Sequence, residues 1–294
     1  KNKIMNNVLV TGGCGFIGGH LVDKLVETYP SAKIVVVDDL RTPGKHINES
    51  DNVTYCFDSI QDPELKYGLM SKYSFDTIFH LANTPRVRRA IEFPAETIDN
   101  NVTSTTAVCD IGLQHSSKIY FAQSSSVQYN DQGTGTNAYT ISKMFCETIL
   151  SMYRDQYGLD VTNMYYYSVY GPREADYGPY STVVRRFKQR IQNDEPMEIF
   201  GNGSKERDFT YVGDVVNNMM QMLDEPDQLD IHFGAGKPVS ILRLAETFSE
   251  YSNNHPYVFK FDIEGEAQIT KSRQPYGEYE GDVLEYIKQW SKSV

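Results

Sequence analysis

Hydrophobic residues in the first half of the chain form short runs, rich in valine, isoleucine and phenylalanine, that do not alternate with polar residues. Runs of this kind predict strands that are buried on both faces of a sheet. We expect strands at Val8–Val10, Lys33–Val37, Val53–Phe57, Thr77–Leu81, Lys118–Ser124 and Val161–Tyr167.

Longer segments with helical periodicity separate these runs. They begin near Phe16, Pro63, Pro94 and Ala138. Strands that alternate with helices predict a parallel sheet covered on both faces. The first half of the chain is therefore expected to be an α/β domain with a doubly wound parallel sheet, the Rossmann arrangement.

The sequence pattern changes after Gly171, where loops rich in glycine and proline separate shorter predicted helices and strands. Helices are expected near Val183–Gln192, Asp214–Leu223 and Leu242–Tyr251, the last of them capped by Ser240. We therefore expect residues 1–170 to form the Rossmann domain. Residues 171–294, partly interleaved with it, would form a smaller C-terminal α/β lobe for the substrate. Ligands commonly bind in the cleft between two such parts.

Composition narrows the function. The chain has 294 residues and a formal net charge of −11, which argues against nucleic-acid binding because that function needs a basic face. No run approaches the roughly 20 apolar residues of a membrane span, and no signal peptide is apparent. The four cysteines lack metal-site spacing and lie in apolar runs, so we expect no metal site, buried reduced thiols and a cytoplasmic protein.

The segment from Val8 to Gly18 combines a strand, a glycine-rich turn and the start of a helix. In a dinucleotide site, the three glycines permit a tight bend, close approach of the pyrophosphate and close helix–strand packing, and the helix amides face the phosphates. The candidate cofactor residues here are Gly12, Gly15, Phe16, Ile17 and Gly18.

Acidic residues at the ends of the next two strands extend this site. Asp38, followed by Asp39, stands 20 residues after the last glycine, where a carboxylate accepts the ribose hydroxyls of NAD and repels the phosphate of NADP. Arg41 and Lys45 add positive charge nearby, so NADP is a second interpretation. Asp58 either binds the adenine amino group or is a turn or helix-cap residue.

Catalytic chemistry is indicated by Tyr139 and Lys143, which stand four residues apart at the start of a predicted helix. An ammonium near a phenol lowers the pKa of the phenol, and a phenolate can take the proton of a sugar hydroxyl while hydride leaves the same carbon. Ser124 ends the preceding strand and can hydrogen-bond the same hydroxyl, together with Ser125 and Ser126.

These motifs resemble those of the extended short-chain dehydrogenases/reductases, specifically the NAD-dependent nucleotide-sugar epimerases and dehydratases, with UDP-glucose 4-epimerase as the nearest type. The resemblance covers most of the chain. It includes Thr11-Gly-Gly-Cys-Gly-Phe-Ile-Gly18, Phe57-Asp58-Ser59-Ile60, His80-Leu-Ala-Asn83, Asn101-Val-Thr, Ser124-Ser-Ser-Val127, Tyr139-Thr-Ile-Ser-Lys143, Val169-Tyr-Gly-Pro-Arg173, Gly201-Asn-Gly-Ser-Lys-Glu-Arg-Asp-Phe209, Tyr211-Val-Gly-Asp214 and Phe233-Gly-Ala-Gly236.

The resemblance implies roles for further residues. It places Tyr139 as the base, Lys143 as its partner, and Ser124 as the catalytic hydroxyl. It implies NAD contacts from Ser59, Ile60, Leu81, Ala82, Asn83, Asn101 and the backbone near Tyr167. It implies Arg207 and, with a poorer local match, Arg273 as ligands of the nucleotide diphosphate. It also implies a UDP carrier and a homodimer formed through the helices that start near Pro94 and Ala138.

Other interpretations of several residues remain open. Arg207 could instead pair with a neighbouring aspartate. Arg86, Arg88 and Arg89 face either the diphosphate or, for at least one of them, solvent. The tyrosines at 165–167 suit a half-buried strand better than a stacking platform.

The reaction itself is inferred from the two residues after Ser124. Dehydratases of the family carry an Asp-Glu pair there and decarboxylases carry a Glu nearby, whereas this chain has Ser125 and Ser126, which are not general bases near neutral pH. This favours 4-epimerisation of a UDP-hexose through a transient 4-keto sugar. A dehydratase or reductase of the same family, and a non-catalytic NAD-binding protein, are the alternatives.

Two departures from the family pattern bear on these alternatives. Tyr139 comes only 15 residues after Ser124, without the usual longer acidic loop, and Ser168 replaces the asparagine that commonly helps to hold the diphosphate. They point to an open pocket, an unusual substrate or lost activity.

Overall fold

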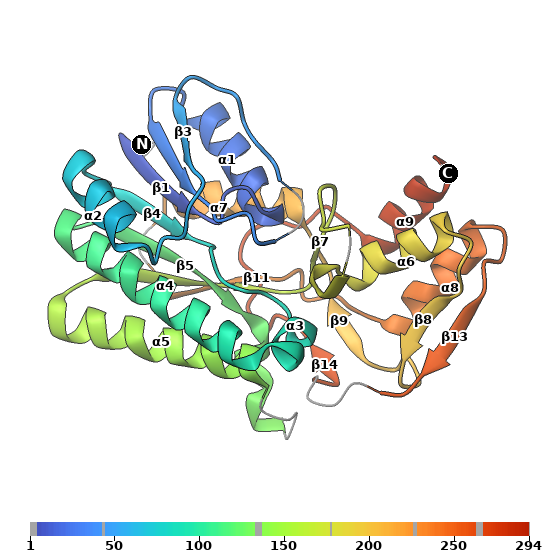
Figure 1. Cartoon of the computed structure of the whole chain (residues 1–294). Coiled ribbons are helices and arrows are strands. Elements are labelled where there is room, and N and C mark those ends of the chain that lie inside the picture. Colours follow the sequence, from blue (N-terminus) through green and yellow to red (C-terminus); the bar gives the residue numbers. More distant parts are fainter. Residues whose placement is uncertain are drawn as a thin grey trace.

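The computed structural model describes residues 5–42, 45–132, 137–176, 178–225, 228–262 and 267–293. Its centre is a seven-stranded sheet in the order β11-β6-β5-β4-β1-β2-β3, in which every neighbouring pair is parallel (Figure 1). The strands are β1 (Asn7–Thr11), β2 (Lys33–Val37), β3 (Val53–Cys56), β4 (Thr77–His80), β5 (Lys118–Ser124), β6 (Asp160–Tyr166) and β11 (Asp230–Phe233). The predicted doubly wound fold is confirmed.

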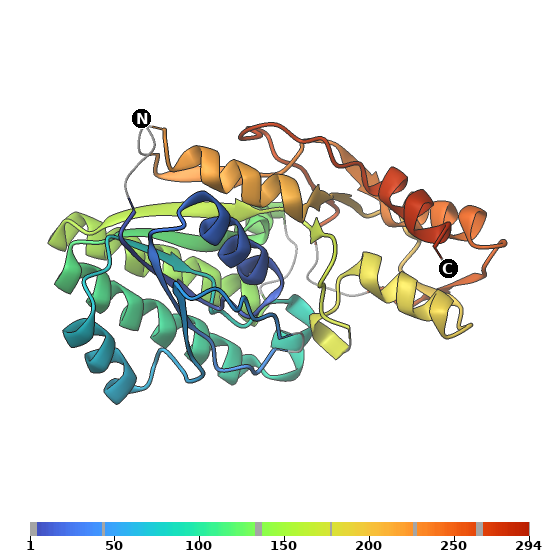
Figure 2. The ribbon, with the colours of Figure 1, turned by 90° about the horizontal axis from the view of Figure 1, so that it is seen from above.

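Helices cover both faces of this sheet. Figure 2 shows α1 (Phe16–Thr28) and α7 (Val212–Met222) on one face and α2 (Pro63–Lys72), α4 (Pro94–His115) and α5 (Ala138–Tyr157) on the other. Val8, Leu9 and Val10 in β1 are consequently all fully buried, although successive side chains point to opposite faces. The unbroken apolar runs of the sequence thus have a direct cause in this layering.

Two elements that follow residue 170 in the sequence belong to the first domain in space. After leaving the first domain, the chain comes back to it with α7, which packs against α1, and with β11, which pairs with β6. The short strand β11 shows little sequence pattern, and it is not among the predicted strands.

The rest of the C-terminal half forms a smaller lobe beside the carboxyl ends of the strands (Figure 1). Its helices are α6 (Val183–Gln192), α8 (Ile241–Tyr251) and α9 (Val283–Ser291). Its strands are β8 (Met197–Phe200) with β13 (Tyr257–Lys260), and β12 (Pro238–Ser240) with β9 (Glu206–Asp208) and β14 (Ile269–Thr270); β7 (Val169–Tyr170) and β10 (Thr210–Tyr211) form a separate pair.

Capping explains several helix starts. The Ser240 hydroxyl accepts the Arg243 amide at α8, as predicted, and Asp62 rather than Asp58 caps α2. Asn137 caps α5 by accepting the Thr140 amide at 2.9 Å, which fixes the helix turn that carries Tyr139.

Three of the four cysteines are buried as expected, while Cys56 is half-buried at the end of β3. All four are free thiols. Among the residues that the structure describes, each helix is too short or too polar to span a bilayer.

Candidate active site

A cavity of about 480 Å³ lies where the carboxyl ends of the large sheet meet the smaller lobe. Its walls come from the ends of β1, β2, β4 and β5, the start of α5, the short helix α3 (Val87–Glu92), and the strands β8 and β9. Parallel strands gather their carboxyl ends at one edge, so the loops after them converge on this space.

The glycine-rich turn forms one end of the cavity. Gly12 has φ +74°, and a Cβ there would lie 2.8 Å from the Ala82 amide nitrogen. A Cβ on Gly18 would lie 2.1 Å from the Gly12 carbonyl oxygen. Gly15, Phe16 and Ile17 line the same end. The turn therefore presents bare backbone and the first amides of α1 to the cavity, which is the environment that a pyrophosphate requires.

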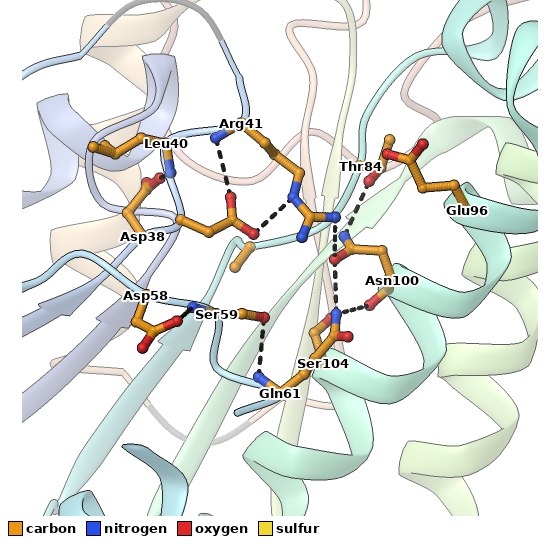
Figure 3. A network of polar contacts seen from close by, with 12 residues as sticks. Asp38, Leu40, Arg41, Asp58, Ser59, Gln61, Thr84, Glu96, Asn100 and Ser104 are labelled. Atoms are coloured by element: carbon orange, nitrogen blue, oxygen red, sulfur yellow. Dashed lines mark hydrogen bonds and ion pairs between the residues drawn. The ribbon is translucent and has the colours of Figure 1, made fainter. Parts of the chain in front are cut away.

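The acid after β2 lies beside this turn, as expected. The Asp38 carboxylate accepts the amides of Cys14 and Leu40, both at 2.9 Å, which orients it at the cavity wall (Figure 3). Burial raises the pKa of Asp38, and the two amides counter that rise. The carboxylate is thereby held in a fixed orientation at the cavity wall.

Arg41 belongs to a polar network in the same corner (Figure 3). Its Nε lies 2.7 Å from the Asp39 carboxylate, and its Nη1 donates to the Asn100 side chain at 2.9 Å. Gln61 donates to the same Asn100 oxygen at 2.7 Å. The charge of Arg41 is therefore already paired with Asp39.

The remaining residues expected to hold NAD divide into two groups. Those that line the cavity are Asp58, Ser59, Ile60, Leu81, Ala82 and Asn83. Asn101 and Tyr167 do not line it: both are fully buried. Asn101 accepts the Thr84 amide at 2.6 Å and donates to Ser142 at 2.9 Å, so it holds the loop after β4 against α5. The Tyr167 hydroxyl contacts Gln128 and His232.

Ser124, Tyr139 and Lys143 all line the cavity, and Ser124 is hydrogen-bonded to Tyr139. Burial raises the pKa of the Tyr139 phenol, whereas a hydrogen bond with Ser124 and the positive charge of Arg86 act to lower it. The Ser124 hydroxyl also lies 2.9 Å from the Ser126 hydroxyl. The predicted grouping of the three residues is thus present, with Arg86 as an additional positive charge.

Lys143 occupies a buried position one helical turn after Tyr139. Its ammonium donates to the Asn83 side chain and to the Ala122 carbonyl, both at 2.5 Å, and lies 4.6 Å from the centre of the Phe121 ring. Burial lowers the pKa of Lys143 to about 8. The ammonium is therefore held by two neutral oxygen acceptors.

The residues expected to hold the substrate are also divided by the structure. Ser125, Ser126, Ser168 and Arg207 line the cavity. Arg207, on β9, donates to the carbonyls of Glu206 and Ala267, both at 2.8 Å. Arg273 does not line it: it is exposed and lies with Tyr129 and Lys271 at a separate depression.

The arginines after β4 have different surroundings. Arg86 and Arg88 line the cavity, whereas Arg89 pairs with Glu96 at 3.0 Å outside it. Phe200 and Arg186, which no sequence motif singled out, also line the cavity. The guanidinium groups of Arg88 and Arg186 lie 5.0 Å and 5.8 Å, respectively, from the centre of the Phe200 ring.

Comparison with known proteins shows the family to which the chain belongs. The model of the NAD dependent epimerase/dehydratase family matches residues 8–236. A putative UDP-glucose 4-epimerase of Methanocaldococcus jannaschii is 29% identical over 248 residues, which cover 81% of this chain and 79% of that protein. A UDP-N-acetyl-alpha-D-glucosaminuronate decarboxylase of Bacillus cytotoxicus is 30% identical over 263 residues, with coverages of 84% and 80%.

The fold agrees with a solved relative. The crystal structure of UDP-glucose 4-epimerase with UDP-glucose from Thermotoga maritima superposes with a TM-score of 0.87 at 28% identity and covers 97% of each chain. The glycine turn and Asp38 fit NAD in shape and charge. The chain, with NAD as its cofactor, therefore belongs to the NAD-dependent epimerase/dehydratase family.

Proposed function

We propose that this protein is a nucleotide-sugar 4-epimerase that acts on a UDP-linked hexose or hexose derivative. The observation that carries the proposal is that Ser124, Tyr139 and Lys143 line the same cavity as the glycine turn and Asp38, which fit NAD. Residues 1–170 would serve mainly the cofactor, and residues 171–294, apart from α7 and β11, mainly the nucleotide sugar.

In this mechanism the Tyr139 oxygen takes the proton of the sugar 4-hydroxyl. NAD, when bound, supplies the hydride acceptor at C4 and returns the hydride later. The Ser124 hydroxyl donates to the same sugar oxygen and orients it, while Lys143 and Arg86 place positive charge near the phenol and favour its phenolate form. Once the 4-keto sugar has turned over in the cavity, Tyr139 gives the proton back.

The positions of the carboxylates in the cavity favour epimerisation over elimination or decarboxylation. Among the residues described, the carboxylates that line it are Asp38, Asp39, Asp58 and Glu198. The first three lie at the ends of β2 and β3, at the cofactor end, and Glu198 pairs with Arg190 at 2.8 Å. Positions 125 and 126, where the dehydratases of the family carry acids, hold serines.

Relatives include decarboxylases and dehydratases as well as epimerases. They also supply the case for UDP: the relatives named above act on UDP-sugars, and Arg207 offers a guanidinium for a diphosphate. The four free thiols support a reducing, cytoplasmic location.

Proton NMR of the purified protein with NAD and a panel of UDP-sugars tests the proposal, because anomeric signals separate C4 epimers directly. A new C4 epimer is the expected result. A 4-keto-6-deoxy sugar or a pentose would show a dehydratase or decarboxylase instead. Net consumption of added NADH with a keto sugar would indicate a reductase, and bound NAD without any turnover would indicate a binding protein.

A further inference from the structure

Arg86 has a backbone conformation that an arginine rarely adopts. Its φ is 82° and its ψ is 130°, at the residue that precedes α3. Positive φ is normally the province of glycine, since a Cβ crowds the backbone there. A residue held in such a conformation is a reason to look for a function of its side chain.

The loop before Arg86 is firmly attached to the helix behind it. The Thr84 amide donates to the Asn101 side chain at 2.6 Å, and Asn101 donates back to the Thr84 carbonyl at 3.3 Å. Asn100 donates to the Thr84 hydroxyl at 3.0 Å, and Pro85 then restricts the chain before Arg86. These contacts fix where the arginine enters the cavity.

The Arg86 guanidinium retains donors for a ligand. Its Nε donates to the Tyr180 carbonyl at 3.1 Å, and within the described part of the chain no further hydrogen-bond partner of the Arg86 side chain is found. An arginine has five N–H donors, so the four on its two terminal nitrogens remain available at the cavity wall.

Two comparisons argue against a purely structural role. Arg89, three residues later, is bound by both oxygens of Glu96 at 3.0 Å and by the Tyr180 hydroxyl. Glu174 is the carboxylate whose charge reaches Arg86, but it accepts the Gly171 amide at 2.9 Å and the Thr182 hydroxyl. A salt bridge between Glu174 and Arg86 is not found among the described residues.

We propose that Arg86 binds a carboxylate on the sugar, so that the substrate is a nucleotide-linked uronic acid. This inference rests on the proposed function, which puts the sugar 4-hydroxyl at Tyr139. Arg86 lies within electrostatic reach of the Tyr139 phenol. The C6 carboxylate of a hexuronate is attached to C5, next to C4, and a guanidinium binds a carboxylate through two parallel hydrogen bonds.

A neutral hexose offers no countercharge at this position. Its C6 hydroxymethyl group would leave the terminal N–H donors of this desolvated guanidinium without an ionic acceptor, since the charge of Glu174 reaches Arg86 but its oxygens accept from Gly171 and Thr182. The other anion of the ligand, the diphosphate, is the competing occupant. Arg207, on β9 in the smaller lobe, already provides a guanidinium for it.

Binding measured on an inert enzyme separates these occupants. In the NAD-loaded Tyr139→Phe variant, calorimetry would give the affinities for UDP-glucuronate, UDP-glucose and UDP, with and without Arg86→Gly. Glycine suits the φ of 82°, so the second change removes the guanidinium without adding strain. We expect UDP-glucuronate to lose roughly 10- to 100-fold in affinity, and at least 10-fold more than UDP-glucose or UDP loses.

Arg89→Ala is the matched control, because it removes a positive charge from α3 outside the cavity; it should leave the ratio of the affinities within about threefold. The proposal is overturned if Arg86→Gly weakens all three ligands equally, which would place Arg86 on the diphosphate, or if the parent does not prefer UDP-glucuronate to UDP-glucose.

Turnover of the same sugars by the unmutated protein, followed by NMR, keeps the two proposals apart. Arg86-dependent binding of UDP-glucuronate without C4 epimerisation would contradict the epimerase and support the carboxylate site. Epimerisation of UDP-glucose with no role of Arg86 in uronate binding would do the reverse.

Discussion

The ammonium nitrogen of Lys143 lies 2.5 Å from the side-chain oxygen of Asn83, a residue of the loop after β4 that lines the cavity. Asn83 is itself oriented by its amide group, which donates to the Ala82 carbonyl and to the Ser104 hydroxyl, both at 3.1 Å. The contact therefore joins the cofactor end of the cavity to α5. Substitution of Asn83 should therefore change the pKa of Lys143, which burial lowers to about 8.

We predict that activity falls as the pH rises through about 8, because Lys143 then loses the proton that stabilises the Tyr139 phenolate. Asn83→Ala removes an acceptor that favours the ammonium, so the alkaline limb of the pH profile should move to lower pH. Asn83→Asp puts a carboxylate in its place and should move the limb to higher pH. Movement of both variants in the same direction would contradict the role of this contact.

Unfolding through the titration of Lys143 does not account for this loss of activity at alkaline pH. The pKa of Lys143 is lower in the folded protein than its ordinary value of 10.5, so the unfolded chain binds more protons between about pH 8 and 10.5. The contribution of this residue to stability therefore increases as the pH rises through that window. Circular dichroism over the window checks that inactivation precedes any loss of structure.

Tyr139→Phe should lower turnover by at least about 10²-fold, since it removes the group that takes the 4-hydroxyl proton. NAD should stay bound, because the glycine turn and Asp38 are untouched. Tyr157→Phe is the control: Tyr157 ends the same helix and is 60% exposed, far from the cavity lining. NMR of the products and the absorbance of NAD released on denaturation measure both effects. Near-normal turnover by Tyr139→Phe would refute the assigned base.

Gly18→Ala should weaken NAD binding by more than about 10-fold. The new methyl carbon would meet the Gly12 carbonyl oxygen at 2.1 Å and push the turn away from the phosphates. Gly68→Ala tests whether any added methyl is harmful: a Cβ at Gly68, in α2, has nothing within 4 Å. The control change should stabilise the protein by about 0.5–1 kcal/mol through helix propensity. Fluorescence titration with NAD and thermal unfolding report the two outcomes.

Strands β1 to β6, the starts of the longer helices and the glycine turn could be predicted because each depends on local pattern. The predicted strands Lys33–Val37 and Lys118–Ser124 have the same bounds in the structure. Strand β11 could not be predicted, because four residues that pair only with β6 carry no pattern of their own.

The contacts of individual side chains are harder to predict from the sequence than helices and strands. Asn101 lies in the predicted helix, yet it points to Thr84 rather than to the cofactor space, since helix rotation is set by tertiary packing. The sequence left Arg86 undecided between the diphosphate and solvent. Its place at the cavity wall depends on the loop that Asn101 holds, which is a contact between residues 17 apart.

Arg207→Met should lower the affinity for UDP by roughly 10- to 100-fold, because it removes a charge-assisted contact to the diphosphate. Arg273→Met should change it by less than about threefold, since Arg273 is exposed outside the cavity. Calorimetry with UDP measures both variants. Equal losses would mean that the second arginine reaches the ligand, as the resemblance to the family implied.

Large apolar side chains are exposed on α5 and on α3, the short helix that precedes α4. Phe145 on α5 is 53% exposed and Ile91 on α3 is 56% exposed. The resemblance to the family implies a homodimer through α4 and α5, and we predict that Phe145→Glu dissociates it by burying a charge in the interface. Phe259→Glu is the matched control, because Phe259 is 55% exposed on β13 of the other lobe. Sedimentation equilibrium should show a dimer for the unmutated protein and for Phe259→Glu, but a monomer for Phe145→Glu. A dimer that survives the Phe145 change and is lost with the Phe259 change would place the interface on the smaller lobe instead.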